Sequence, residues 1–316
     1  MIEHIADLLK HETAGEPVHG LKWTRKTTRK IAGQLRRLNI RISANTVGRL
    51  LKDMGFSLRV NHKRLESGSK NPPPRRVRNR QFKYINQKRD EFASRRSPII
   101  STDAKKKELI GNFKNPGVSW EEEPYLVKDH DFRSDADGMA IPYGIYDTQA
   151  NLGFVAVGTS HETPAFAVDA IVLWWKSCGT KMYPKAKELL ILADCGGGNG
   201  ARSRAWKYHL QHQLCGPHKL TVTVCHYPPG ASKWNPIEHR LFPFISANWA
   251  AHPLVSYEAM LKRIRATRTE TGLRVRASLN NKEYQTGLKV SDAQMQQIAL
   301  TPARVHPQWN YSIAPS

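Results

Sequence analysis

Short apolar runs and longer helical patterns alternate through the last two-thirds of the chain. Residues 98–103, 188–194 and 220–225 are apolar runs of strand length, and each leads into a break formed by charged residues, glycines or prolines. Residues 140–146 and 153–159 are also strand-like, and the polar turn between them predicts an antiparallel pair. Together these runs predict that one sheet organises this part of the chain.

Helices are predicted between and after the later strands. Apolar residues at helical spacing predict a helix over residues 163–178 and another over residues 201–214. A third helix is expected to begin near Asn235, because Pro236 suits the first turn of a helix. The predicted order is therefore β-β-β-α-β-α-β-α, which is an α/β arrangement with a mixed sheet flanked by helices.

The N-terminal segment has a different pattern, typical of two short helices joined by a tight turn. The apolar positions of residues 26–39 share one helical face, and basic residues occupy the others. A second apolar stripe follows Ser43, a suitable N-cap, and ends before Gly55. Residues 56–60 then read as a strand, so the segment fits a helix-turn-helix with a wing. An ordinary basic helical hairpin fits the same pattern.

Composition divides the chain into three parts. Residues 66–80 contain three consecutive prolines and several arginines, and such a segment cannot bury a core. Helical periodicity resumes over residues 81–96. We therefore expect a helix-turn-helix segment over residues 1–65, a basic Pro/Arg linker over 66–80 and the main α/β domain over 81–316.

Positive charge is concentrated at the N-terminal end. The chain has 49 Lys and Arg against 27 Asp and Glu, a formal charge of +22. Residues 1–100 hold 24 basic and 8 acidic residues, a balance of +16, so only +6 remains for the other 216 residues. Clustered Lys and Arg predict nucleic-acid binding, because neutralising phosphates releases condensed counterions. A basic solvated surface, or one that binds membranes, is the alternative.

Several other classes of protein are disfavoured. The four cysteines have no C-x-x-C spacing, which argues against a structural zinc site. No secretory leader precedes them, and the longest nearly apolar run, residues 165–175, is too short to span a bilayer. We therefore expect a cytoplasmic protein with reduced cysteines and no membrane partner.

Three acidic residues stand in comparable places along the chain. Asp103 closes the first strand, and Asp194 follows an apolar run directly before a glycine-rich turn. Glu238 lies on the first turn of the helix that follows the strand at 220–225. Open α/β sheets present their sites at the carboxyl ends of strands, so we expect these three carboxylates to converge. The helix macrodipole alone also favours an acid in a first turn, which leaves a purely structural role open for Glu238.

Converging carboxylates would form an oxygen-rich pocket suited to hard divalent cations such as Mg²⁺. Acids on the first strand, the fourth strand and a later helix are the arrangement of ribonuclease H-like nucleotidyl transferases. The predicted fold is accordingly a ribonuclease H-like mixed sheet flanked by helices, preceded by a small all-α helix-turn-helix segment. Asp147, also at a strand end, would take the place of Asp103 if Asp103 did not belong to the site.

Four longer motifs resemble those of a known family. They read STDAKKKELIGNFKNPG, AIPYGIYDTQANLGFVAVGTSHETPAF, ILADCGGGNGARSRAWK and CHYPPGASKWNPIEHRLFPFISANW. They are similar to motifs of bacterial insertion-sequence transposases with a Rhodopirellula-type transposase DDE domain, related to the mariner-like branch. The resemblance covers about residues 1–311, with WTRKTTRKIAGQL near the start and TGLKVSDAQM and PQWNYSI near the end. Family chains usually carry a further basic helical segment ahead of this region, so we expect this chain to be short at its N-terminus.

The resemblance implies a DDE transposase that cleaves and joins DNA with two Mg²⁺ ions, for which Mn²⁺ can substitute. Asp103, Asp194 and Glu238 would be its catalytic and metal-binding triad, with Asp103 shared by both ions. The implied partners are double-stranded DNA, as element ends and as target, and further copies of the chain in a homo-oligomer on the DNA, at the bacterial nucleoid. Two other functions stay open: an inactive or domesticated transposase that only binds DNA, and a ribonuclease H-like nuclease that hydrolyses without joining.

Further residues are predicted to contact DNA or to assist the triad. The predicted DNA contacts are Arg29, Lys30, Asn45, Thr46, Arg49, Lys52, Arg75, Arg76, Arg78, Arg80, Lys105 and Lys233. The charged run around Lys105 also fits a solvated surface. Asn235 and His239 flank Glu238 and are candidate auxiliary residues, although an ordinary structural role explains His239 as well.

Overall fold

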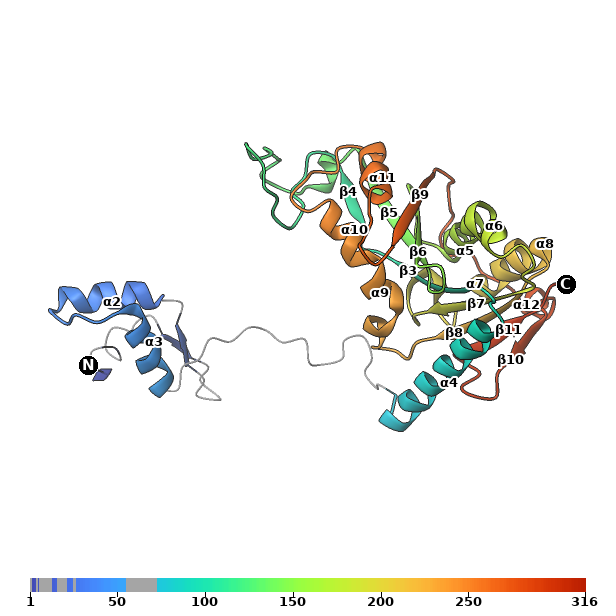
Figure 1. Ribbon diagram of the computed structural model, residues 1–316, viewed down its shortest axis with the longest axis horizontal. Coiled ribbons are helices and arrows are strands. Elements are labelled where there is room, and N and C mark those ends of the chain that lie inside the picture. Colours follow the sequence, from blue (N-terminus) through green and yellow to red (C-terminus); the bar gives the residue numbers. More distant parts are fainter. Residues whose placement is uncertain (1, 4, 6–12, 16–21, 25–26, 55–72) are drawn as a thin grey trace. The chain divides into compact units, whose positions relative to one another are not determined.

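The computed structural model describes residues 2, 3, 5, 13–15, 22–24, 27–54 and 73–316 (Figure 1). The chain divides into two compact units, Met1–Leu65 and Glu66–Ser316, and each is described by itself. The strand predicted over residues 56–60 and the first part of the predicted linker lie outside the described residues.

The first unit contains a short strand pair and the two helices that the sequence predicts. β1 (Thr13–Gly15) pairs with β2 (Lys22–Thr24) in antiparallel register. The helices are α2 (Thr28–Arg37) and α3 (Ala44–Asp53).

Side-chain caps stabilise the N-termini of α2 and α3, and one apolar cluster packs the two helices together. The hydroxyls of Thr27 and Ser43 cap the two helix N-termini by accepting backbone N–H groups. Ile31, Leu35 and Val47 are fully buried in the cluster between the helices. Because the apolar residues face inward, the basic residues of both helices lie mainly on the solvent side.

A mixed sheet forms the centre of the second unit. Its strands in the described residues are β3 (Ile99–Ala104), β4 (Glu108–Ile110), β5 (Gly138–Asp147), β6 (Leu152–Gly158), β7 (Glu188–Ala193), β8 (Thr221–His226), β9 (Arg274–Asn280), β10 (Leu300–Pro302) and β11 (Asn310–Ile313). The strand order is β10-β11-β8-β7-β3-β5-β6-β9, and β4 pairs with β5 outside this path. β3 is central, since it runs parallel to β7 and antiparallel to β5. The mixed α/β fold predicted from the sequence is thus confirmed.

Helices cover both faces of this sheet. They are α4 (Arg75–Ser94), α5 (Pro164–Trp174), α6 (Thr180–Met182), α7 (Arg204–His209), α8 (Gly216–His218), α9 (Pro236–Arg240), α10 (Phe242–Asn248), α11 (Tyr257–Arg265) and α12 (Asp292–Gln296). Among the helices of the described residues, none combines the length and the apolarity needed to cross a membrane.

Successive residues of a strand point to opposite faces, which gives the sheet two core layers. On β7, Leu189 and Ile191 pack in a cluster with residues of α5 and α7, whereas Leu190 and Leu192 pack with residues of α4. The face that α4 covers continues over β5, β6 and β9, where α9, α10 and α11 supply a separate cluster. Figure 1 shows these three helices beside the β5, β6 and β9 end of the sheet.

The structure corrects the sequence-based boundaries in two places. α4 begins at Arg75 rather than near residue 81, because Pro74 takes the N-cap position, where the missing N–H of proline costs nothing. Arg75, Arg76, Arg78 and Arg80 are therefore helical rather than part of an extended linker. The strands β9, β10 and β11 were not predicted: β9 and β11 each pair with a strand far away in the sequence, and β10 joins the sheet only through β11.

Candidate active site

Asp103 lies near the end of the central strand of the sheet. β3 and β7 run parallel, and their register pairs Thr102 with Ala193; the next residues are Asp103, within β3, and Asp194, directly after the end of β7. Asp103 is 9% exposed, and its Oδ1 accepts the backbone N–H of Ala104 at 2.8 Å. The parallel register alone thus brings two of the three predicted acids to one edge of the sheet.

A glycine-rich loop positions Asp194. The backbone N–H of Gly196 donates to Asp194 Oδ1 at 3.3 Å, and Gly197 has a φ of +62°, in the left-handed region. A Cβ on Gly198 would lie 3.0 Å from the carbonyl oxygen of Thr163, so the loop packs directly against the N-terminus of α5. The glycines therefore keep the loop close to the sheet edge.

Glu238 reaches the same edge because α9 is anchored to β3. The buried side chain of Asn235 donates to the carbonyl oxygen of Thr102 at 3.1 Å and accepts the hydroxyl of Ser101. The same hydroxyl accepts the backbone N–H of Ile237 at 3.0 Å. These three bonds fix the start of α9, and Glu238 lies on its first turn.

Gly144 allows α9 and α10 to approach the sheet this closely. It lies opposite Asp103 in the register of β3 and β5. A Cβ at this position would lie 2.6 Å from the ring of Phe242 and 2.8 Å from Cδ1 of Ile237, the neighbour of Glu238. Only a glycine therefore fits between Asp103 and the helix that carries Glu238.

The three carboxylates interact strongly. Burial, the negative charge of Asp194 and that of Glu238 together raise the pKa of Asp103 to about 8. Burial also raises the pKa of Asp194 to about 6, with a contribution from the charge of Glu238. Within the described part of the chain, no Lys, Arg or His forms an ion pair with any of the three. The edge of the sheet thus carries concentrated negative charge without a protein cation to balance it.

This arrangement fits divalent metal ions of the hard class. Carboxylate oxygens are the ligands that Mg²⁺ and Mn²⁺ prefer, and a dication would offset both the burial and the mutual repulsion that raise the pKa values of the two aspartates. Among the described residues, no three or more His, Cys, Asp or Glu side chains are grouped closely enough to hold a metal ion as they stand. The electrostatic effect of Asp194 and Glu238 on Asp103 is therefore the observation that links the three carboxylates.

Comparison with known proteins decides the family. The profile of the family described as "Rhodopirellula transposase DDE domain" matches residues 4–315, nearly the whole chain. The chain belongs to this family. It is therefore a DDE-type DNA transposase, an enzyme of polynucleotidyl transfer and strand cleavage, with DNA as its partner and a dependence on divalent metal ions.

Among solved structures, the transposase is similar to those of the Mos1 transposase. A Mos1 paired-end complex with the left transposon end matches at 15% identity and a TM-score of 0.41, over 83% of this chain and 69% of that chain. The Mos1 Strand Transfer Complex matches at 16% identity and a TM-score of 0.43, over 83% and 68%. A mariner Mos1 paired-end complex with Mg matches at 16% and 0.43, over 83% and 69%. The search of curated proteins gives no match.

Sequence reasoning missed a fourth acid beside these three carboxylates. Glu162 adds to the negative potential at Asp194, and one of its carboxylate oxygens lies 3.6 Å from Nζ of Lys107. A Cβ on Gly197 would lie 3.0 Å from the other oxygen of Glu162. Glu162 precedes α5 in a loop, where nothing in the local pattern distinguishes it from a solvent-exposed acid.

The structure places the auxiliary residues and the two predicted lysines in different settings. Asn235 is fully buried and joins α9 to β3, so its role is to hold the site together. His239 is exposed, and its ring bonds to the backbone carbonyl of Lys233. The Nζ of Lys105 forms an ion pair with Oε1 of Glu108 at 2.8 Å and lies over the ring of Trp249. Lys233 is exposed, and its Nζ lies over the ring of Trp234. Lys105 is therefore less suited to a DNA contact than Lys233.

The other predicted DNA contacts lie on helix surfaces. Exposed side chains are found at Arg29, Lys30, Asn45, Arg49, Lys52, Arg75, Arg76 and Arg80. Thr46 is half-buried, and its hydroxyl bonds to the capping hydroxyl of Ser43 at 2.9 Å. Arg78 is also half-buried on α4. The exposed charged residues are therefore better placed than Thr46 to contact DNA.

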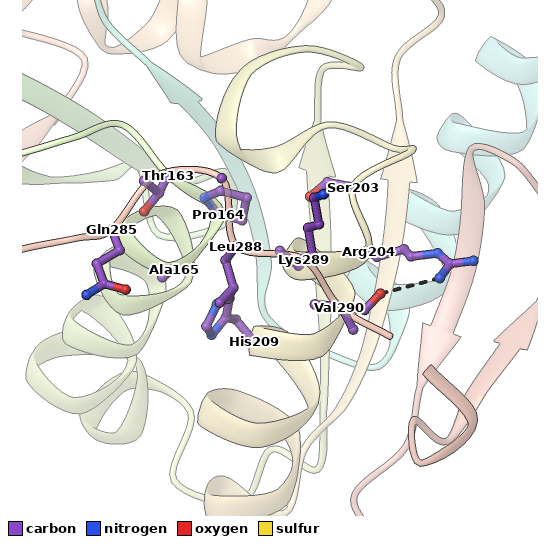
Figure 2. Close-up of a pocket in the computed structure, with 12 residues that line it drawn as sticks. Thr163, Pro164, Ala165, Ser203, Arg204, His209, Gln285, Leu288, Lys289 and Val290 are labelled. Atoms are coloured by element: carbon purple, nitrogen blue, oxygen red, sulfur yellow. Dashed lines mark hydrogen bonds between the residues drawn. The ribbon is translucent and has the colours of Figure 1, made fainter. Parts of the chain in front are cut away.

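Two other features do not belong to the carboxylate cluster. The carboxylate of Asp147 accepts two backbone N–H groups of its own turn and the hydroxyl of Tyr183, which is a structural role. A cavity of about 480 Å³ lies beside the N-termini of α5 and α7, with His209 and Lys289 among the residues that line it (Figure 2). None of the three carboxylates lines this cavity.

Replacing Asn235 by Ala is expected to destabilise the transposase. It should also lower the cleavage activity by more than the loss of stability alone explains. The substitution leaves the carbonyl of Thr102 and the hydroxyl of Ser101 buried without their partner, at a cost of about 1–3 kcal/mol. Urea unfolding measures the first effect and nicking of labelled DNA the second. Asn248→Ala is the matched control, because its exposed amide also donates to two oxygens, on Arg263 and Thr267. Equal effects of the two substitutions on nicking would contradict this role for Asn235.

The pKa of Asp103 predicts how pH affects the metal-free protein. In the folded state this pKa is raised from 3.8 to about 8. The proton on Asp103 therefore stabilises the folded state fully below pH 4, and this stabilisation is lost as pH rises towards 8. We expect the melting temperature of Asp103→Asn, relative to wild type in EDTA, to rise between pH 5 and pH 8. A constant difference over this range would contradict the prediction.

Proposed function

We propose that Asp103, Asp194 and Glu238 are the catalytic triad of this transposase and that they hold two Mg²⁺ ions, or Mn²⁺ in their place. The observation that carries the proposal is the convergence of three carboxylates from β3, from the loop after β7 and from α9 around the buried Asp103. A DNA-binding protein without catalysis has no use for such a cluster, because carboxylates repel phosphates.

The positions of the carboxylates support a division of roles. The charges of Asp194 and Glu238 both act on Asp103, so Asp103 is assigned to both ions, Asp194 to one and Glu238 to the other. Bound there, the ions would activate a water or a DNA 3′-hydroxyl and stabilise the leaving oxygen. The protein residues hold and orient the site, and no covalent bond between protein and DNA is required.

We further propose that residues 1–65 bind the element ends through the α2–α3 pair and that the basic stretch 66–80 follows phosphates toward the catalytic domain over 81–316. The exposed basic residues of α2, α3 and the first turns of α4 support this division. Neutralising phosphates makes such binding dependent on salt. The enzyme would act in the bacterial cytoplasm, where the element and its targets lie.

We also propose that the transposase acts as a homo-oligomer on DNA. The segment between β4 and β5 exposes large apolar side chains: Val118 at 92%, Trp120 at 103% and Leu126 at 86%. Large contiguous patches of exposed apolar side chains mark sites of interaction between proteins. Sedimentation of wild type and Trp120→Ser, each with and without end DNA, tests the proposal; a single copy of the wild-type chain on each DNA would overturn it.

Labelled DNA that carries the element ends tests the proposed reaction. We expect strand cleavage with Mg²⁺ or Mn²⁺ and none in EDTA, followed by joined products when target DNA is added. Cleaved but never joined products would favour a hydrolytic nuclease. DNA binding without cleavage in either metal would favour a transposase that has lost its activity.

A further inference from the structure

His226 meets the backbone of Asp194 at the point where the sheet ends. The ladder between β7 and β8 closes with the pair Ala193 and His226, so the carbonyl of Asp194 lies beyond the last strand hydrogen bond. The ring nitrogen Nδ1 of His226 lies 2.7 Å from this carbonyl oxygen. A carbonyl only accepts hydrogen bonds, so Nδ1 must carry a proton and donate. The imidazole thus supplies the donor that a neighbouring strand would otherwise provide.

The other side of the ring fixes which nitrogen carries the proton. Nε2 of His226 lies 3.1 Å from the hydroxyl of Tyr311, and this hydroxyl accepts the indole N–H of Trp206 at 2.9 Å. Because the indole is only a donor, the hydroxyl keeps its own proton for Nε2. The donors and acceptors of this series of hydrogen bonds are therefore fixed: Trp206 donates to Tyr311, Tyr311 donates to His226, and His226 donates to Asp194.

The three side chains that form these hydrogen bonds are buried. His226 is 0% exposed, Trp206 is 0% exposed and Tyr311 is 2% exposed. In such surroundings each hydrogen bond is strong, and an unsatisfied partner is costly. The two hydrogen bonds of the ring therefore favour a single orientation and a single tautomer.

The backbone of His226 is held as firmly as its ring. Its N–H donates to the carbonyl of Trp309 at 2.9 Å, and its own carbonyl accepts the side-chain amide of Gln81, on α4, at 2.8 Å. The amides of Gln81 and Asn310 also bond to each other in both directions, at 2.7 Å. The motif PQWNYSI, which ends at Ile313, thus supplies three neighbouring residues that surround this histidine.

We propose that His226 is a positioning residue for Asp194: Tyr311 and Trp206 hold its ring in one tautomer, and the ring holds the Asp194 carbonyl so that the carboxylate stays in place beside Asp103. The inference rests on the proposed metal site. It adds a role for a side chain that touches neither metal nor DNA and for the strand β11, which carries Tyr311.

Metal affinity of the full-length protein tests the inference. Titration calorimetry with Mn²⁺ compares wild type, His226→Leu, His226→Asn and Tyr311→Phe. We expect His226→Leu to bind Mn²⁺ about tenfold more weakly or worse, the range found for residues that orient metal ligands. Asn places an amide N–H where Nδ1 stood, so His226→Asn should recover most of the affinity. Tyr311→Phe, which removes one oxygen, should show a smaller loss than His226→Leu.

A second readout and a matched control separate positioning from general packing. Nitrogen-15 spectra of the metal-free protein should show His226 with protonated Nδ1 and bare Nε2, and Tyr311→Phe should shift the Nε2 signal. Thr223→Val is the control, because the hydroxyl of Thr223 bonds to that of Ser312 at 2.9 Å on the same two strands, β8 and β11. It should leave Mn²⁺ affinity unchanged.

The outcomes distinguish this inference from the metal site itself. Folded His226→Leu with wild-type Mn²⁺ affinity, while Asp194→Ala loses binding, would overturn the role of His226 alone. If His226→Leu fails to fold, Tyr311→Phe decides: unchanged affinity and an unchanged Nε2 signal overturn the inference. Mn²⁺ binding that survives Asp194→Ala would overturn the metal site, and the positioning role with it.

Discussion

Asp103→Asn is expected to abolish metal-dependent cleavage of element-end DNA, by at least about 10³-fold. The substitution keeps the shape of the side chain and removes the charge that the proposal assigns to both ions. Charge stabilisation by a metal is worth several kcal/mol, and each 1.36 kcal/mol changes the rate tenfold. Asp194→Asn and Glu238→Gln should lose activity to a similar degree, because residues that act as one unit do not contribute additively.

DNA binding should survive these substitutions. The triad carries negative charge, so its removal takes away repulsion of phosphates rather than attraction, and mobility shifts in EDTA should be equal to or stronger than those of wild type. Glu270→Gln, an exposed acid in the turn before β9, is the control that should cut at the wild-type rate. Triad variants that still cut DNA in Mg²⁺ and in Mn²⁺ would refute the assignment.

Gly144→Val is expected to remove most activity and to lower stability at the same time. Its side chain would occupy the space of the buried side chains of Ile237 and Phe242, which are 0% and 6% exposed. Overpacking of this kind costs about 1–3 kcal/mol. The strain is relieved if α9 moves outward, which carries Glu238 away from Asp103, and a displacement of about 1 Å can cost 10²-fold in rate.

A second variant that also lowers stability separates the loss of activity caused by a displaced α9 from the loss caused by lower stability. Ile141 lies on the same strand as Gly144 but faces the opposite core layer, so Ile141→Val should cost about 0.5–1.5 kcal/mol without moving α9. Thermal unfolding measures the stability of both variants, and nicking of labelled DNA measures their rates. If the two variants lost activity in proportion to stability alone, the spacing between β5 and α9 would not matter for catalysis.

The sequence anticipates the core of the fold because its signals there are local. The runs that end at Asp103 and Asp194 are both strands, and the proline at the start of α9 places Glu238 on a first turn. Parallel pairing of β3 and β7 then brings the first two acids together without further information. Their convergence follows from these rules, whereas their catalytic role stays a prediction until variants are assayed.

Other features depend on contacts that no local pattern records. The burial of Lys105 against Trp249 and the approach of Glu162 to Asp194 join segments from separate parts of the chain. The strand β11 pairs with β8 across more than 80 residues, and neither strand contains a signal for the other. His226 illustrates this limit, because in the sequence it reads as an ordinary core or surface histidine, and only the fold shows which carbonyl it faces.

The pairing of β11 with β8 has a consequence for how the protein is made. Residues 310–313 complete the sheet next to the strand that ends at His226, and they are synthesised long after Asp103, Asp194 and Glu238. A nascent chain still on the ribosome contains all three acids before it contains the strand that braces them. On the proposed role of His226, the carboxylate site is therefore complete only after translation has passed Ile313, and unfinished chains lack it.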